Sequence, residues 1–139
     1  MKNFNALTQA VYLLNQQQNT MIEEYAATVM NQMLKNNELV YIPIHKLNGE
    51  FAFSPRIIED NGRIFLVIFS DEQFVKKDEQ TDVAQININK LVELIEADET
   101  IYGISINPFN YGFKVNISRK QIKHIKKLDK YKKSSLKMQ

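Results

Sequence analysis

The feature that most constrains the fold of this chain is an unbroken apolar run at residues 64–69, Ile-Phe-Leu-Val-Ile-Phe. A strand with one face in water alternates apolar and polar residues, whereas an unbroken run is typical of a strand buried on both faces. We therefore expect this segment to be a central strand. Both of its faces need cover, which amphipathic segments elsewhere in the chain must provide.

Residues 39–69 predict a three-stranded meander that ends in this strand. The segment 39–44 is β-rich, and its Pro43 favours an edge strand or a strand end, because proline has no N–H to donate to a neighbouring strand. Asn-Gly pairs at 48–49 and 61–62 are typical of tight hairpin turns, since both residue types accept positive φ angles. Each turn would join two antiparallel neighbours.

Apolar residues recur at helical spacing in two N-terminal stretches, 4–14 and 20–33. Thr20, with Glu23 three residues later, predicts a capping box at the start of the second stretch, and the asparagines at 36–37 predict its end. The polar residues between the stretches leave two arrangements open: two helices, or one helix of about 45 Å at 1.5 Å per residue. The single helix would overhang a small sheet and favour a homodimer.

Beyond the central strand, helical and strand patterns alternate. Ser70 and Ser118 each precede a helical stretch and carry Gln three residues later, so both are predicted as helix N-caps. Asn89 is predicted to cap a helix between them. Residues 101–106 and 113–117 alternate in the manner of strands.

This order of elements predicts an α/β (α+β) fold, a mixed β-sheet of about five to six strands flanked by helices. We divide the chain into a long N-terminal helical segment (1–37), an α/β core (38–118) and a basic C-terminal helix and tail (119–139). The length of 139 residues suits one domain with its own core. Because no apolar stretch is long enough for a membrane span or a secretory leader, we expect a cytoplasmic protein.

The residue types that most enzymes and metal sites need are missing or scattered. The chain has no cysteine, which excludes thiol nucleophiles, Cys-ligated zinc and redox pairs. Neither His45 nor His124 has a metal-ligating residue at suitable spacing. The four glycines are too dispersed for a phosphate-binding loop, and no pair of carboxylates is singled out. We therefore expect no enzymatic activity, no metal and no cofactor.

The net charge of +2 conceals a strong asymmetry. Residues 119–139 contain nine lysines and arginines and one acid, so they carry +8 and the rest of the chain −6. We expect the apolar stripe of this helix to pack on the sheet, with its lysines facing water or acidic loops. The alternative is nucleic-acid or anionic-surface binding through Lys123, Lys126, Lys127 and Lys130. The helix has one arginine and one late aromatic, Tyr131, so it offers few bidentate or stacking contacts.

Three short motifs follow one another in the middle of the chain. They are Val-Tyr-Ile-Pro-Ile at 40–44, the run at 64–69 with Asn-Gly before it and Ser-Asp-Glu after it, and Ile-Ser-Ile-Asn-Pro-Phe at 104–109. In this order they resemble the SseB protein N-terminal domain, whose pattern has a Tyr/Phe-x-Pro strand, a strand closing in Phe-Thr-Ser/Asp and a late strand closing in Asn-Pro. The resemblance covers roughly residues 38–118.

The resemblance implies a compact α/β domain, found in bacterial proteins, with no established catalytic activity and no catalytic residues to carry over. Ser70 stands where the family pattern has Thr, which keeps a hydroxyl group. The chain ends soon after this domain, so we expect the family's second domain to be missing. Asn107, before Pro108, is predicted to be extended and to tie down a turn with its side chain, a structural role in preference to a binding role.

These expectations favour a non-enzymatic domain that acts by protein–protein contact with a partner that the sequence does not identify. Strand ends and aromatic residues converge at one candidate interaction surface. Its residues are Tyr41, Phe69, Asn107, Phe109 and Tyr111. The aromatic side chains there either form that surface or close the core.

Overall fold

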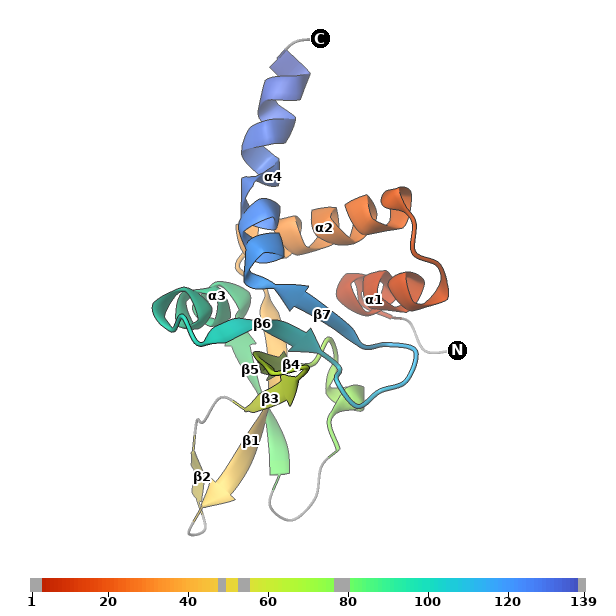
Figure 1. Ribbon diagram of the computed structural model, residues 1–139. Helices are drawn as coiled ribbons and strands as arrows, with labels where there is room; N and C mark the ends of the chain where they lie inside the picture. The colour runs from red at the N-terminus through yellow and green to blue at the C-terminus, as the bar shows by residue number, and fades with distance from the viewer. Residues whose placement is uncertain (1–3, 48–49, 53–55, 77–80, 138–139) are drawn as a thin grey trace.

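The computed structural model describes residues 4–47, 50–52, 56–76 and 81–137, with the side chains of these residues apart from 46–52 and 129–137. Within these ranges the helices are α1 (Ala6–Gln16), α2 (Thr20–Lys35), α3 (Ile88–Ala97) and α4 (Arg119–Lys137) (Figure 1). The strands are β1 (Leu39–Leu47), β2 (Glu50–Ala52), β3 (Ile57–Asp60), β4 (Arg63–Ile68), β5 (Thr81–Asn87), β6 (Ile101–Ile106) and β7 (Val115–Ser118). A short 3₁₀ helix, η1 (Glu72–Phe74), follows β4. None of the helices in these ranges combines the length and apolar character needed to cross a membrane.

The strands form two sheets, one in the order β2-β1-β5 and one in the order β3-β4-β6-β7. All pairings within them are antiparallel apart from that of β4 with β6, which is parallel. Helices lie on and around these sheets (Figure 1). The predicted α/β fold with a mixed sheet and flanking helices is confirmed, although the described residues form seven strands in two sheets instead of the expected single sheet of about five to six.

The apolar run at residues 64–69 forms most of β4, which lies between β3 and β6 as predicted for a central strand. Its side chains alternate between two apolar clusters. Leu66 and Ile68 are at most 1% exposed and belong to the main core, to which all four helices contribute. Val67 and Phe69 belong to a smaller cluster with Val75. Both faces of β4 are therefore covered, as the unbroken run requires.

The expected meander is wrong, because residues 39–69 form two hairpins that belong to different sheets. β2 pairs with β1, and β3 pairs with β4. The two sheets meet at one antiparallel bridge between Tyr41 and Phe69. There, the N–H of Tyr41 donates to the oxygen of Phe69 (3.1 Å), and the N–H of Phe69 donates to the oxygen of Tyr41 (2.7 Å). The single strand expected between the two Asn-Gly turns is replaced by β2 and β3, which pair with different strands.

Pro43 lies inside β1, where it is opposite Val83 of β5, whereas the described pairing of β1 with β2 is confined to residues 45–47. The proline is therefore not at a strand end, but among the described residues β1 has a neighbouring strand on only one side at this position. The N–H and C=O of Tyr41 bond to Phe69 and so point away from β5. By the two-residue period of a strand, the same holds at position 43. The absent N–H of Pro43 therefore removes no hydrogen bond to β5.

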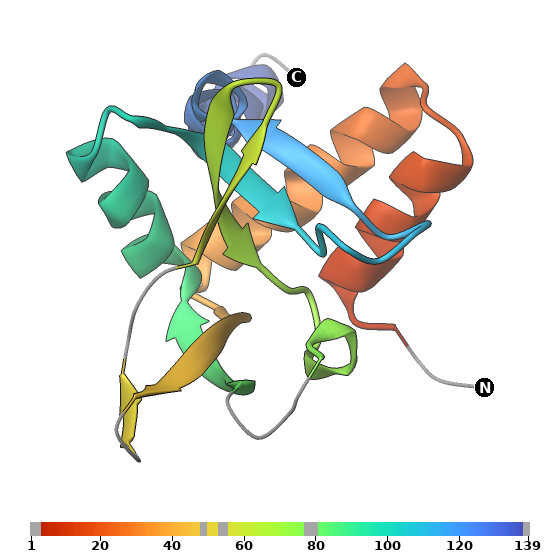
Figure 2. The same ribbon diagram turned by 60° about the horizontal axis from the view of Figure 1, so that its bottom comes forward.

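α1 and α2 are separate helices that lie side by side, so the arrangement with two N-terminal helices holds (Figure 2). The N-cap of α2 is Asn19 instead of the predicted Thr20, and its Oδ1 accepts from the N–H of Ile22 at 3.0 Å. The helix ends at 36–37 as predicted, where Asn37 has a left-handed φ of 49°.

α4 begins with the predicted capping box. The N–H of Gln121 donates to Ser118 Oγ (3.1 Å), and the N–H of Ser118 donates to Gln121 Oε1 (2.8 Å). Asn89, by contrast, is not a cap. Its amide donates to the oxygen of Leu34 (2.8 Å) and to Asn37 Oδ1 (2.9 Å), so it ties α3 to the end of α2.

Arg119, the first residue of α4, closes the C-terminal end of α3. Its guanidinium donates to the main-chain oxygens of Ile95, Asp98 and Ile101. These carbonyls lie at the end of α3 and in the turn into β6, where a helix leaves its last carbonyls without partners. In the same turn, hydrogen bonds from the hydroxyl and N–H of Thr100 lower the pKa of the Asp98 carboxyl below its ordinary value.

We predict that Arg119→Ala lowers the free energy of unfolding by about 1.5–3 kcal/mol, the range for hydrogen bonds from a charged donor. Urea denaturation followed by circular dichroism measures this loss. Lys120→Ala, at the neighbouring exposed position, is the matched control and should change stability by less than about 0.5 kcal/mol. Equal effects of the two substitutions would contradict the role of Arg119 as a cap.

Candidate functional site

Ser70 and Asn107 form a buried hydrogen-bonded pair at the carboxyl ends of β4 and β6. The N–H of Ser70 donates to Asn107 Oδ1, and Asn107 Nδ2 donates to Ser70 Oγ, both at 3.0 Å. Ser70 is 3% exposed and Asn107 is fully buried. Since β4 and β6 run parallel, their carboxyl ends lie at the same edge of the sheet, which places these two residues side by side.

α1 joins the same network. The hydroxyl of Thr8, which is also fully buried, donates to Ser70 Oγ at 2.8 Å, and Asn5 Nδ2 donates to the oxygen of Ser70 at 2.7 Å. The N–H, hydroxyl and C=O of Ser70 are thus all engaged. We call Thr8, Ser70 and Asn107, with their mutual hydrogen bonds, the polar network.

The structure corrects the predicted cap at Ser70. The N-cap of η1 is Asp71, whose side chain accepts from the N–H of Gln73. A Gln three residues after Ser70 produced the cap prediction, but the actual partner, Asn107, lies 37 positions away. Local spacing cannot reveal a partner that depends on how two strands pair. The available signal was Thr8, a polar residue next to the apolar stripe of a helix.

The predicted role of Asn107 in tying down a turn is confirmed, but its predicted extended backbone is wrong. Its φ is 52°, in the left-handed region, which asparagine tolerates better than most residues. Its N–H donates to the oxygen of Ile68 (3.0 Å), and its Nδ2 donates to that of Phe113 (3.1 Å) as well as to Ser70. These bonds fix the conformation against the preference for extended backbone before proline.

The loop that starts at Asn107 presents two aromatic side chains to solvent. Phe109 is 70% exposed and Tyr111 is completely exposed. The residue between them is tied to η1, because Asn110 Nδ2 donates to the oxygen of Phe74 at 3.2 Å. Phe113 then returns to an aromatic cluster, where its ring lies 4.9 Å from that of Phe74. We call residues 107–113 the aromatic loop.

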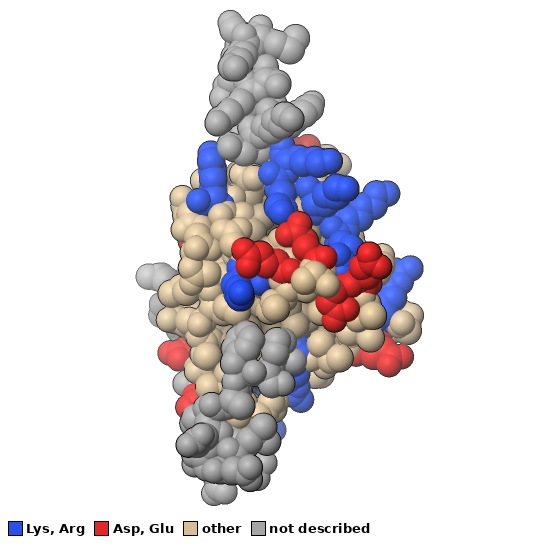
Figure 3. Space-filling view, turned by 90° about the vertical axis from the view of Figure 1, so that its left-hand side faces the viewer, with Lys and Arg blue, Asp and Glu red and all other residues tan. Residues whose placement is uncertain are grey.

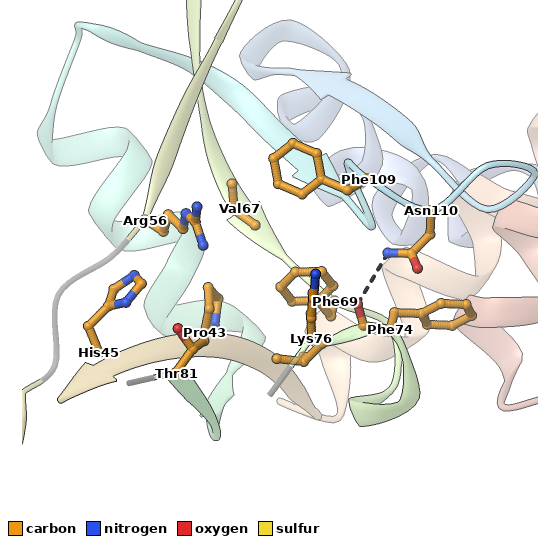
Figure 4. A pocket seen from close by; sticks show the side chains of 11 residues that line it. Pro43, His45, Arg56, Val67, Phe69, Phe74, Lys76, Thr81, Phe109 and Asn110 are labelled. Carbon is orange, nitrogen blue, oxygen red and sulfur yellow. Dashed lines mark hydrogen bonds between the residues drawn. The ribbon is translucent and has the colours of Figure 1, made fainter. Parts of the chain in front are cut away.

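A groove of about 910 Å³ lies beside this loop (Figure 4). It lies where the chain of β4 changes its hydrogen-bonding partner from the β3 segment to β1. The N–H of Val67 donates to the oxygen of Arg56, just before β3, whereas Phe69 bonds to β1. The residues that line the groove come from both sheets, from η1 and its vicinity, and from the aromatic loop. The lining residues are Pro43, His45, Arg56, Val67, Phe69, Phe74, Val75, Lys76, Thr81, Phe109 and Asn110.

The groove combines an apolar floor with positive charge. Val67 and Phe69 form the floor, and Phe109 stands across the groove from β1 (Figure 4). Arg56 lies near His45 at one end (Figure 4). With Lys76, these give two permanent cations and one imidazole, and no Asp or Glu occurs among the described residues of the lining.

The five residues of the predicted interaction surface divide between exterior and interior. Phe109 and Tyr111 are exposed on the aromatic loop, and Phe109 lines the groove. Phe69 is 5% exposed and Asn107 is fully buried, so they support the surface from beneath. Tyr41 is half-buried against the cluster of Val67 and Phe69. Phe69 is thus part of the interior, whereas Phe109 and Tyr111 face solvent.

The lysines of the alternative basic surface lie on α4. Figure 3 shows a group of Lys and Arg side chains next to Asp and Glu side chains on one side of the molecule. Lys123, Lys126 and Lys127 are exposed. Lys126 Nζ forms an ion pair with Glu96 of α3 at 3.1 Å. The side chain of Lys130 lies outside the described residues. One of the three described lysines is therefore already partnered by an acid of the same chain.

Within the described ranges, no group of three or more His, Cys, Asp or Glu side chains is placed to hold a metal ion. His45 lines the groove on β1, and His124 is exposed on α4. In comparisons with known proteins, no family model, no curated protein and no solved structure matches the chain. The resemblance to the SseB N-terminal domain rests on the sequence motifs and stays a prediction.

We predict that Asn107→Ala lowers the free energy of unfolding by about 3 kcal/mol, because it leaves a buried N–H unpaired and places alanine at a positive φ. Thermal and urea denaturation measure the change. Asn116→Ala is the matched control, since its side-chain amide donates to Asp60 at the surface, and should cost less than about 0.5 kcal/mol. Asn107→Gly accepts the positive φ and should still lose most of that stability. Near-native stability of Asn107→Gly would contradict the importance of the side-chain bonds.

Proposed function

We propose that the chain is a non-enzymatic, SseB-like bacterial domain that acts in the cytoplasm by contact with another protein. The contact surface would consist of the aromatic loop and the adjoining groove. The observation that carries this proposal is the exposure of Phe109 and Tyr111 on a backbone held by partly buried side-chain hydrogen bonds. Two such aromatic side chains have no role in the core.

Exposed aromatics on a fixed loop suit binding for a physical reason. Aromatic side chains supply large contact areas with few rotatable bonds, so they lose little entropy when a partner covers them. A loop already held in one conformation avoids the further cost of ordering on binding. The polar network and the bond from Asn110 to Phe74 supply that pre-organisation.

Nucleic-acid or anionic-surface binding through α4 is the second candidate. The exposed Lys123 and Lys127 favour it. The ion pair of Lys126 with Glu96 weakens it, because a nearby carboxylate repels phosphate and competes for the same ammonium group. We therefore prefer the aromatic surface.

We predict that the double variant Phe109→Ala/Tyr111→Ala loses the partners that the wild-type chain captures from a lysate of its own organism, since both anchors are removed. Quantitative mass spectrometry of the two pull-downs measures the loss. The control is Met21→Ala/Tyr25→Ala, which removes two exposed side chains on α2 and should keep those partners. An unchanged set of partners in Phe109→Ala/Tyr111→Ala would contradict the proposal.

A further inference from the structure

We infer that the groove binds an acidic segment of the partner protein, in which a large apolar side chain is accompanied by Asp or Glu. This inference rests on the proposed function and specifies the chemistry of the ligand. Three observations support it: the residue types that line the groove, the exposed Arg56 side chain without a partner among the described residues, and the position of Phe109.

The arginines of the chain provide the first argument. Of the three, Arg63 donates to the hydroxyl of Tyr102 and its guanidinium lies over that ring, while Arg119 bonds to three carbonyls of the backbone. Arg56 is exposed at the end of the groove, and its side chain makes no hydrogen bond or ion pair with any described residue. A guanidinium offers a planar set of donors that matches a carboxylate in two parallel bonds.

Lys76 adds a second permanent positive charge to the groove. It lies just after η1 and is exposed, and its side chain likewise has no hydrogen-bonding or ionic partner in the described part of the chain. With Arg56 it gives the described lining two permanent positive charges and no carboxylate. Such a field favours the approach of an acidic segment and disfavours a basic one.

The floor of the groove indicates the other half of the ligand. Val67, Phe69 and Val75 line the groove but are nearly buried, at 1%, 5% and 8% exposed, whereas Phe109 in the same lining is 70% exposed. An aromatic or aliphatic side chain placed here would cover Phe109 and complete the smaller apolar cluster. The volume of about 910 Å³ is sufficient for one such side chain and its neighbours.

A polypeptide fits this surface better than a nucleic acid does. Single-stranded nucleic acids are bound along a continuous positive groove with successive stacking side chains. Here two permanent cations lie around an apolar floor, and Phe109 is the exposed aromatic side chain of the lining. Binding of a nucleic acid is therefore an outcome that the experiment must be able to detect.

The test is a selection of random 12-residue peptides displayed on phage against the immobilised full chain. Selected sequences are then synthesised with a fluorescent label, and their affinity is measured by anisotropy. We expect enrichment of Asp and Glu around a large apolar residue. Arg56→Gln and Lys76→Gln should each weaken binding about fivefold in low salt, the effect of one exposed charge pair. Lys90→Gln is the control, because Lys90 pairs with Glu93 on α3, and it should leave the affinity unchanged.

Selected peptides without acidic enrichment whose binding is lost in Phe109→Ala would overturn this inference and leave the proposed function standing. The inference also fails if an unlabelled oligothymidylate displaces the selected peptides from the groove. If no selected peptide depends on Phe109, both the inference and the proposed function fail. Acidic peptides that depend on Phe109, Arg56 and Lys76 support both.

Discussion

The hydrogen bonds between Ser70 and Asn107 are the interaction on which the rest of this structure depends. They join the ends of the two parallel strands, β4 and β6, and Thr8 extends them to α1. All three residues are at most 3% exposed. In such surroundings an unpaired polar group is costly, so each member requires the others to remain in place. Three parts of the chain that are far apart in sequence are thereby held in one arrangement.

This constraint also explains where the candidate site lies. Ligand sites in open α/β sheets are found beyond the carboxyl ends of parallel strands. Here those ends are occupied by the polar network, and the chain leaves it in two directions. After Asn107 it forms the aromatic loop, and after Ser70 it forms η1, which leads to Lys76 at the groove. The same buried bonds thus position both the exposed aromatics and one of the cations.

Some local signals in the sequence were informative, although the predicted caps at Thr20 and Asn89 were wrong. The unbroken apolar run predicted the central strand, and the capping box at Ser118 predicted the start of α4. The sequence did not reveal which strands and side chains pair across the fold. The meander, the cap at Ser70 and the extended Asn107 were all inferred from neighbours in sequence. Each was overruled by a contact across the fold, such as the bridge of Tyr41 with Phe69. The candidate surface was predicted in part: Phe109 and Tyr111 were identified, whereas Arg56 and Lys76 became visible only when two sheets met beside them.

The most direct test of the central role of the polar network is native-state amide hydrogen exchange of the wild-type chain, followed by NMR. The N–H groups of Ser70 and Asn107 donate to Asn107 Oδ1 and the oxygen of Ile68. If the network holds the fold together, these two amides exchange only through global unfolding, with protection equal to that of the core of β4 and β6. Exchange of the Ser70 amide by local opening, while the core amides stay protected, would contradict the account.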